Sequence, residues 1–167
     1  ADAQDDGSGE AAAAPKTVLC VDDELSVLSA LKRTLRARDL TIVTATSGVQ
    51  ALEIMAGLPV DLVISDMRMP GMDGAQLLER ICSDWPDTTR ILLTGYSDAA
   101  ATIRAVNRGR IFRYLQKPWD EGELAESVRE GLALRMRLKD EARRLSTSTT
   151  QAAQVRQLND ELQQLQE

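Results

Sequence analysis

The sequence predicts an α/β protein in which a doubly wound, five-stranded parallel sheet is followed by a long helical extension. Short apolar runs of strand-forming residues alternate with stretches of helical spacing between residues 16 and 134. The connections between them are short, which favours parallel strands joined by right-handed crossovers. Carboxylate, hydroxyl and lysine side chains follow several predicted strands, at the edge where such sheets carry their chemistry.

The first part of the chain changes character at residue 16. Residues 1–15 combine acidic residues, glycine, serine and an alanine run, so we expect a disordered tail. Residues 17–21 form the first predicted strand. A helix up to residue 38 follows from leucines at helical spacing, namely Leu25, Leu28, Leu31 and Leu35.

Two further strand and helix units come next. Residues 40–44 and 61–65 are predicted strands, separated by a helix that begins near Ser47 and ends near Gly57. The third helix ends near Trp85 and is predicted from its apolar residues Leu77, Leu78 and Ile81.

The last units follow the same alternation. Residues 90–94 and 111–115 are predicted strands, and residues 99–106 are a predicted helix between them. Asp120 is expected to cap a helix that begins near Glu121 and shows no stop signal.

Residues 135–167 are predicted to form a helical coiled-coil linker. Their apolar residues recur mostly at steps of three and four, at Leu138, Ala142, Leu145, Ala152, Val155, Leu158, Leu162 and Leu165. The steps are irregular between Ala152 and Leu158, and residues 146–150 have weak helix propensity, so a hinge or a register shift is expected there. The alternative is a solvated polar helix or a frayed tail.

Composition excludes several classes of function. A net charge of −6 argues against general affinity for nucleic acid or anionic membranes, and no apolar run is long enough to span a bilayer. Histidine is absent, which excludes histidine-based metal sites and triads within these residues. Cys20 and Cys82 fall inside a predicted strand and helix, where buried thiols are expected rather than a disulfide. The simplest location is the cytoplasm.

Acidic residues from two strands are predicted to meet at one edge of the sheet. Asp22 and Asp23 follow the first strand, and Asp66 follows the third. Carboxylates gathered at one edge repel each other unless a cation lies among them, and an all-oxygen site suits Mg²⁺. Thr94 ends the fourth strand and Lys117 follows the fifth, so a hydroxyl and an ammonium group are expected at the same edge.

This combination defines a reaction. A carboxylate held beside Mg²⁺ and a lysine can attack a phosphoryl donor, because both cations neutralise charge on the phosphoryl oxygens. The product would be an aspartyl phosphate on Asp66. Each residue also has a structural alternative: Asp22, Asp23 or Thr94 could cap a helix, and Tyr114 could belong to the core.

These motifs resemble the receiver domain of two-component response regulators. The resemblance covers roughly residues 16–134 and is carried by Asp22 and Asp23, by Asp66 with its Met-Pro-Gly-Met-Asp-Gly continuation, by Thr94 and Gly95, and by Tyr114 and Lys117 with Pro118. It implies a flavodoxin-like fold, a partner histidine kinase or phosphotransfer protein, and a domain that accepts a phosphoryl group without being a turnover enzyme.

The resemblance also implies a role for each residue. Asp66 is the phosphoacceptor; Asp23, Asp66 and the backbone carbonyl of Arg68 would bind Mg²⁺, with Asp22 acting through water; Thr94 and Lys117 would hold phosphoryl oxygens; and Tyr114 would turn inward as Thr94 moves. The Lys117–Pro118 peptide bond is expected to be cis.

The output of such a switch is expected to lie beyond residue 167. Residues 112–120 resemble receivers attached to cyclic-di-GMP enzymes, particularly HD-GYP phosphodiesterases, with a GGDEF diguanylate cyclase or a hybrid kinase as alternatives. We expect a homodimer through the C-terminal helix, and through the face of the fourth helix, fifth strand and fifth helix. The alternative function is a constitutive dimerisation module without phosphotransfer.

Overall fold

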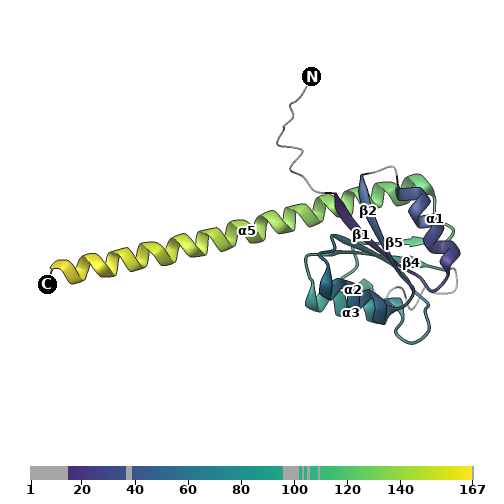
Figure 1. Cartoon of the computed structure of the whole chain (residues 1–167), viewed down its shortest axis with the longest axis horizontal. Coiled ribbons are helices and arrows are strands. Elements are labelled where there is room, and N and C mark those ends of the chain that lie inside the picture. Colours follow the sequence, from purple (N-terminus) through teal and green to yellow (C-terminus); the bar gives the residue numbers. More distant parts are fainter. Residues whose placement is uncertain are drawn as a thin grey trace, which may run out of the picture.

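The computed structural model describes residues 15–36, 39–95, 102, 104, 106–108 and 110–166, of which 146–149 and 166 are described by backbone alone. Its centre is a parallel five-stranded sheet with strand order β2-β1-β3-β4-β5 (Figure 1). The strands are β1 (Lys16–Val21), β2 (Leu40–Ala45), β3 (Leu62–Asp66), β4 (Thr89–Thr94) and β5 (Arg113–Gln116). The predicted α/β fold with a doubly wound parallel sheet is confirmed.

The helices also follow the prediction, with shifts at their ends. They are α1 (Leu25–Leu35), α2 (Gly48–Gly57), α3 (Gly74–Asp84) and α5 (Glu121–Gln166). Between β4 and β5, Thr102, Arg104 and residues 106–108 are helical, whereas the rest of the predicted fourth helix lies outside the described residues. The predicted tail at residues 1–15 lies outside them too, except for Pro15.

Two hydrophobic clusters cover the two faces of the sheet. Residues of α2 and α3, including Met55 and Leu78, pack on one face against Val63 of β3. On the other face, residues of α1 and α5 pack against alternate residues of the same strands, such as Ile64 of β3. Because successive side chains of a strand point to opposite faces, continuous apolar runs supply both clusters. Cys20 is buried and Cys82 half-buried, and both are free, as predicted.

Side-chain caps fix where the helices begin. The Ser47 hydroxyl accepts a hydrogen bond from Gln50 N, where a helix was predicted to begin. Asp120 Oδ2 accepts one from Glu123 N at 2.8 Å and caps α5 as predicted. Asp73 and Gln76 form a reciprocal capping box at α3. In contrast, α1 has Glu24 at its N-cap without a side-chain hydrogen bond. Asp22 and Asp23 therefore do not cap this helix.

The first part of α5 is anchored to the sheet. A Cβ atom on Gly131 would lie 2.7 Å from Leu62 Cδ1, so a larger residue here would require the Leu62 side chain to shift. The Thr89 hydroxyl donates to the Gly131 carbonyl at 2.7 Å. One turn further, Arg135 Nε donates to Asp61 Oδ1 at 3.2 Å, with both side chains largely buried. These contacts fix the position of the helix where it leaves the domain.

Beyond this anchor α5 continues away from the sheet as a single helix (Figure 1). From Asp140 onward every described side chain is exposed. The expected absence of a stop signal is confirmed, because the helix runs on to Gln166. None of the helices in the described part of the chain has an apolar stretch of the length that crosses a membrane.

Candidate functional site

Three carboxylates gather at the carboxyl edge of the sheet, where the sequence predicted them. Asp22 follows the last residue of β1 and is fully buried, and Asp66 ends β3 and is 7% exposed. Asp23 is exposed beside them. One carboxylate oxygen of each of the three lies within 4.8 Å of the others. Such a group of oxygen ligands can hold a divalent cation.

Lys117 brings a single positive charge into this group. Its Nζ lies 2.8 Å from Asp66 Oδ1 and 3.0 Å from Asp22 Oδ2. The Lys117–Pro118 peptide bond is cis, as expected. The lysine thus connects the ends of β1, β3 and β5, and the three carboxylates exceed it in charge.

Burial and pairing act on the ionisation of these groups in opposite senses. Burial raises the pKa of Asp22, although the Glu24 N–H and Lys117 both favour its charged form. Burial alone would lower the pKa of Lys117, but its hydrogen bonds to Asp66 and Asp22 outweigh this and raise the pKa above its usual value. Lys117 is therefore charged at neutral pH, whereas the ionised form of Asp22 is held at a cost.

Hydrogen bonds hold the Asp22 carboxylate and the backbone of both buried aspartates in place. Glu24 N donates to Asp22 Oδ1 at 2.9 Å, and Asp22 N donates to Ala45 O in the neighbouring strand. The Ser65 hydroxyl donates to the Asp66 carbonyl at 2.9 Å. These contacts hold the site before any ligand arrives.

Gly74, the last residue of the Met-Pro-Gly-Met-Asp-Gly motif, makes a further contribution to the site. A Cβ atom at this position would lie 2.0 Å from the Asp66 carbonyl oxygen and 2.9 Å from Met67 Cα. The start of α3 therefore passes directly against the backbone of Asp66, and Gly74 N donates to Met67 O at 2.8 Å. The sequence shows a glycine where a helix begins, which is compatible with a close approach. It does not show that the backbone of Asp66 is what the glycine approaches.

The remaining predicted residues lie at or near the same edge. Thr94 ends β4, is 4% exposed, and its carbonyl accepts a hydrogen bond from Lys117 N at 2.8 Å. Arg68 is exposed just after β3. Tyr114 is 55% exposed on the edge strand β5, so it does not belong to the core. The structural alternative for Tyr114 is therefore wrong.

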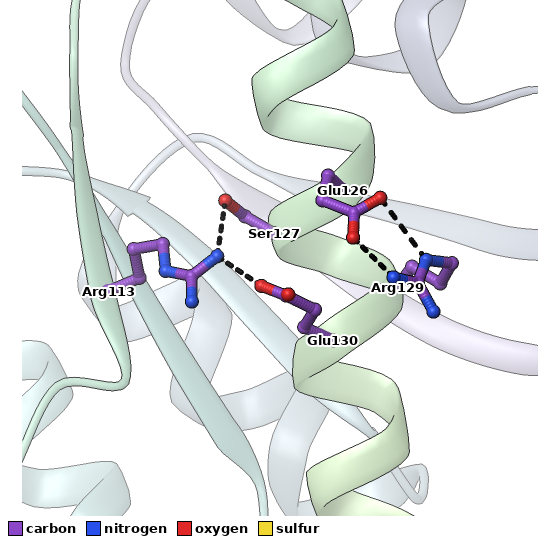
Figure 2. A network of polar contacts seen from close by, with 5 residues as sticks. All are labelled: Arg113, Glu126, Ser127, Arg129 and Glu130. Carbon is purple, nitrogen blue, oxygen red and sulfur yellow. Dashed lines mark hydrogen bonds and ion pairs between the residues drawn. The ribbon is translucent and has the colours of Figure 1, made fainter.

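A polar network that the sequence did not indicate ties β5 to α5. Figure 2 shows its members, which are Arg113, Glu126, Ser127, Arg129 and Glu130. Arg113 Nη1 donates to the buried Ser127 hydroxyl at 3.2 Å and forms an ion pair with Glu130. Because Arg113 precedes Tyr114 in the strand, a change in β5 at this point bears directly on α5.

Fold and site together define a class: doubly wound α/β domains with an acidic pocket and a lysine at the carboxyl edge of the sheet. The chain belongs to the response regulator receiver domain family, which it matches over residues 18–129. This confirms the resemblance seen in the sequence.

Three relatives show where this domain is found. The hydrogenase transcriptional regulatory protein HoxA of Cupriavidus necator is 36% identical over 116 residues, which are 70% of this chain and 24% of HoxA. The sensor kinase CckA of Brucella abortus is 42% identical over 118 residues, 70% of this chain and 12% of CckA. The solved signal receiver domain of an HD domain-containing protein from Pseudomonas fluorescens Pf-5 is 42% identical, with a TM-score of 0.71, covering 73% of this chain and 98% of that domain.

The chain thus spans about a quarter of HoxA and about an eighth of CckA. The three relatives differ in kind: one is a transcriptional regulatory protein, one a sensor kinase and one an HD domain-containing protein. Family membership therefore defines the class of this domain and leaves its output to be argued separately.

Proposed function

We propose that this chain is a phosphoacceptor switch, in which Asp66 receives a phosphoryl group from a partner histidine kinase or phosphotransfer protein. The observation that supports this most strongly is the geometry around Asp66. A nearly buried carboxylate lies 2.8 Å from a lysine ammonium and within 4.8 Å of two further carboxylates. A nucleophile, a fixed cation and a set of metal ligands are thus present together.

The donor set fits Mg²⁺. Three carboxylates face one lysine, which leaves excess negative charge, and all available ligands are oxygens. We assign the metal to Asp23, Asp66 and the backbone carbonyl of Arg68, with Asp22 acting through water. When bound, Mg²⁺ would neutralise charge on the phosphoryl oxygens. Asp22 would lose part of the cost of its buried charge.

The chain's own residues act on the phosphoryl group as follows. An Asp66 carboxylate oxygen forms a bond to phosphorus, and the bond from phosphorus to the donor nitrogen breaks. The electron pair stays on that nitrogen, which takes up a proton. Lys117 already lies beside the acceptor, and we assign Lys117 and Thr94 to the phosphoryl oxygens. None of these steps releases the phosphoryl group and restores free Asp66, so we assign the chain the role of a switch and not of a turnover enzyme.

Transmission of the signal is assigned to the elements next to Lys117. We propose that Tyr114 turns inward from its exposed position when Thr94 engages the phosphoryl group. The neighbouring Arg113 would then carry the change to α5 through Ser127 and Glu130. This is a shift between two populations, driven by contacts that exist only with the phosphoryl group.

The proposed output is a domain that metabolises cyclic-di-GMP, reached through α5 and a homodimeric coil. The similarity of this chain to the receiver of an HD domain-containing protein favours that output. HoxA and CckA make a transcriptional regulator and a hybrid kinase the alternatives. The homodimer would use the C-terminal helix and the face formed by the segment between β4 and β5, β5 and α5. The proposal places the domain in the cytoplasm.

Intact-mass spectrometry with acetyl phosphate tests this proposal. The wild type should gain one phosphoryl group when Mg²⁺ is present and none when it is chelated. Asp66→Asn should gain none. Asp61→Asn is the matched control, because it removes a carboxylate at the opposite edge of the same sheet and should still react. A wild type that never gains mass, or an Asp66→Asn variant that gains as much, would contradict the proposal.

A further inference from the structure

The outer part of α5 carries an apolar stripe that the described part of the chain leaves uncovered. Its large apolar side chains are 56–82% exposed, at Leu145, Val155, Leu158, Leu162 and Leu165. The stripe runs along about 40 Å of helix, at 1.5 Å per residue from Asp140 onward. In proteins most helix stability comes from packing an apolar face, so a stripe of this length calls for a partner.

One heptad register continues the face that α5 buries against its own sheet. Positions seven residues apart hold Leu124, Gly131, Leu138, Leu145 and Ala152. Leu124 belongs to the core, and Gly131 lies against Leu62. The same stripe thus continues past the edge of the sheet and is exposed from Asp140 onward. We call this the inner register. Its next position outward is Asn159, a polar residue in the seam.

A second register fits the end of the helix better. Val155, Leu158, Leu162 and Leu165 are spaced by three, four and three residues, with no polar residue in the seam. We call this the outer register. Traced backward, it would place Arg144 and Gln151 in the seam, where the inner register has Leu145 and Ala152. It therefore cannot serve the first half of the extension.

In the inner register the second seam position of each heptad lies three residues after the first, so Val155 and Leu162 belong to both registers. The registers differ in which residue between these two also lies in the seam. The inner register adds Asn159, and the outer one adds Leu158. A change between them moves Val155 from one seam position to the other, which rotates the helix by about 50° at 3.5 residues per turn. The conflict falls at residues 146–150, where β-branched and hydroxyl residues weaken the helix. Neither register satisfies the whole extension.

We propose that the extension pairs in parallel with a second copy of this chain and changes from the inner to the outer register on phosphorylation. A second copy fits because identical stripes are self-complementary about a two-fold axis. In the outer register β-branched Val155 is followed by leucine at Leu158 and Leu165, and a β-branched residue before leucine in the heptad favours two parallel strands. The flanking positions hold Gln154, Asn159 and Glu161, which oppose no residue of like charge.

The start of α5 is fixed to the sheet, so a register change in the extension would rotate the outer part of α5 relative to the receiver domain. The Thr89 hydroxyl on Gly131 and the Asp61–Arg135 ion pair fix α5 to the sheet. Without a phosphoryl group this geometry continues into the inner register. The dependence on phosphorylation rests on the proposed function, whereas the two registers follow from the helix alone.

Oxidative crosslinking of single cysteines in the full chain tests the proposal. In a Cys82→Ser background only buried Cys20 remains, and burial raises the pKa of its thiol to about 12. Asn159→Cys reports the inner register and Leu158→Cys the outer. Asp160→Cys faces away from both seams and is the matched control. Each variant is oxidised with and without Mg²⁺ and beryllofluoride, and beryllofluoride binding is followed separately by thermal shift.

The ratio of crosslinking at 159 to crosslinking at 158 should fall by about tenfold when beryllofluoride binds, equivalent to ~1.4 kcal/mol between the registers. Equal crosslinking at 158, 159 and 160, or none, would overturn the coil. An unchanged ratio despite a thermal shift would overturn the register change and leave the phosphoacceptor intact. If no thermal shift occurs, the proposed function fails. The two registers are then tested with Leu165→Gln, which weakens the outer seam and should raise crosslinking at 159. Unchanged crosslinking at 159 would contradict the two registers.

Discussion

Carboxylate groups lie beside a cation at both edges of the sheet, and the two edges differ in charge balance. At the carboxyl edge Asp22, Asp23 and Asp66 surround one lysine, Lys117. At the amino edge Asp61 forms an ion pair with Arg135. Asp61 Oδ2 also accepts a hydrogen bond from the Thr17 N–H at 2.9 Å, so its second oxygen has a partner within the fold.

This difference separates a site for chemistry from a structural contact. A balanced and hydrogen-bonded pair needs nothing further and holds α5 against the sheet. The three carboxylates carry more negative charge than Lys117 neutralises, and burial adds a cost that is visible in the raised pKa of Asp22. Of these two sites, the one at the carboxyl edge is therefore the one that a metal ion can stabilise further.

The largest effect is expected from filling the space beside Asp66. Gly74→Ala would place a Cβ atom 2.0 Å from the Asp66 carbonyl oxygen, so the backbone must move. We expect a loss of about 3 kcal/mol in the free energy of unfolding, measured by urea denaturation. Gly57→Ala is the control, because no atom lies within 4 Å of its Cβ position. Equal stability of Gly74→Ala and Gly57→Ala would contradict the close approach.

Breaking the amino-edge pair should come next. Arg135→Met should cost about 2 kcal/mol, less than for a fully buried pair because Asp61 keeps its backbone partner. Arg143→Met is the control: its pairing with Asp140 at 3.7 Å is exposed, and its loss should cost no more than about 0.5 kcal/mol. Denaturation of both variants checks this. Equal losses of stability in Arg135→Met and Arg143→Met would mean that Arg135 does not anchor α5.

The carboxyl edge should respond in the opposite direction. Because the folded pKa of Asp22 is raised, the stability it contributes is present below its ordinary value of 3.8 and is lost as the pH rises through the folded value. Asp22→Asn removes the charge and should stabilise the Mg²⁺-free protein at neutral pH by about 0.5–1 kcal/mol. The gain should shrink toward pH 4. A destabilised variant at neutral pH would show that the Lys117 contact outweighs burial.

The interior between the edges should be inert to thiol reagents. Cys20 is fully buried in β1, and burial raises the pKa of its thiol to about 12, whereas Cys82 on α3 is half-buried. Iodoacetamide should modify Cys82 alone in the native protein, without a measurable change in stability, as read by peptide mass mapping. Native-state labelling of Cys20 at a rate like that of Cys82 would contradict this packing.

Sequence reasoning recovered the features that depend on local pattern. Strand and helix order, the caps at Ser47 and Asp120, and the meeting of Asp22 with Asp66 all follow from periodicity and from the edge rule for parallel sheets. The last strand was predicted at residues 111–115 and lies at Arg113–Gln116. The apolar pair Ile111 and Phe112 favours a strand by composition, whereas ladder pairing with β4 begins only at Arg113.

What sequence reasoning missed depends on contacts between distant residues. Asp61 and Arg135 are 74 positions apart, and Thr89 and Gly131 are 42 apart. A glycine within a helix indicates a close approach without naming its partner. The network of Arg113, Ser127 and Glu130 likewise needs the placement of α5 against β5, which no periodicity supplies (Figure 2).

The most direct test of the difference between the two edges is the thermal midpoint during a Mg²⁺ titration of the wild type, Arg135→Met and Asp22→Asn. The first two should rise with Mg²⁺ by the same increment, since a ligand that binds only the folded state stabilises it. Asp22→Asn should rise by a smaller increment, because it loses the carboxylate that acts on the metal through water. Equal increments in all three proteins, or no increment in the wild type, would contradict a metal site at the carboxyl edge.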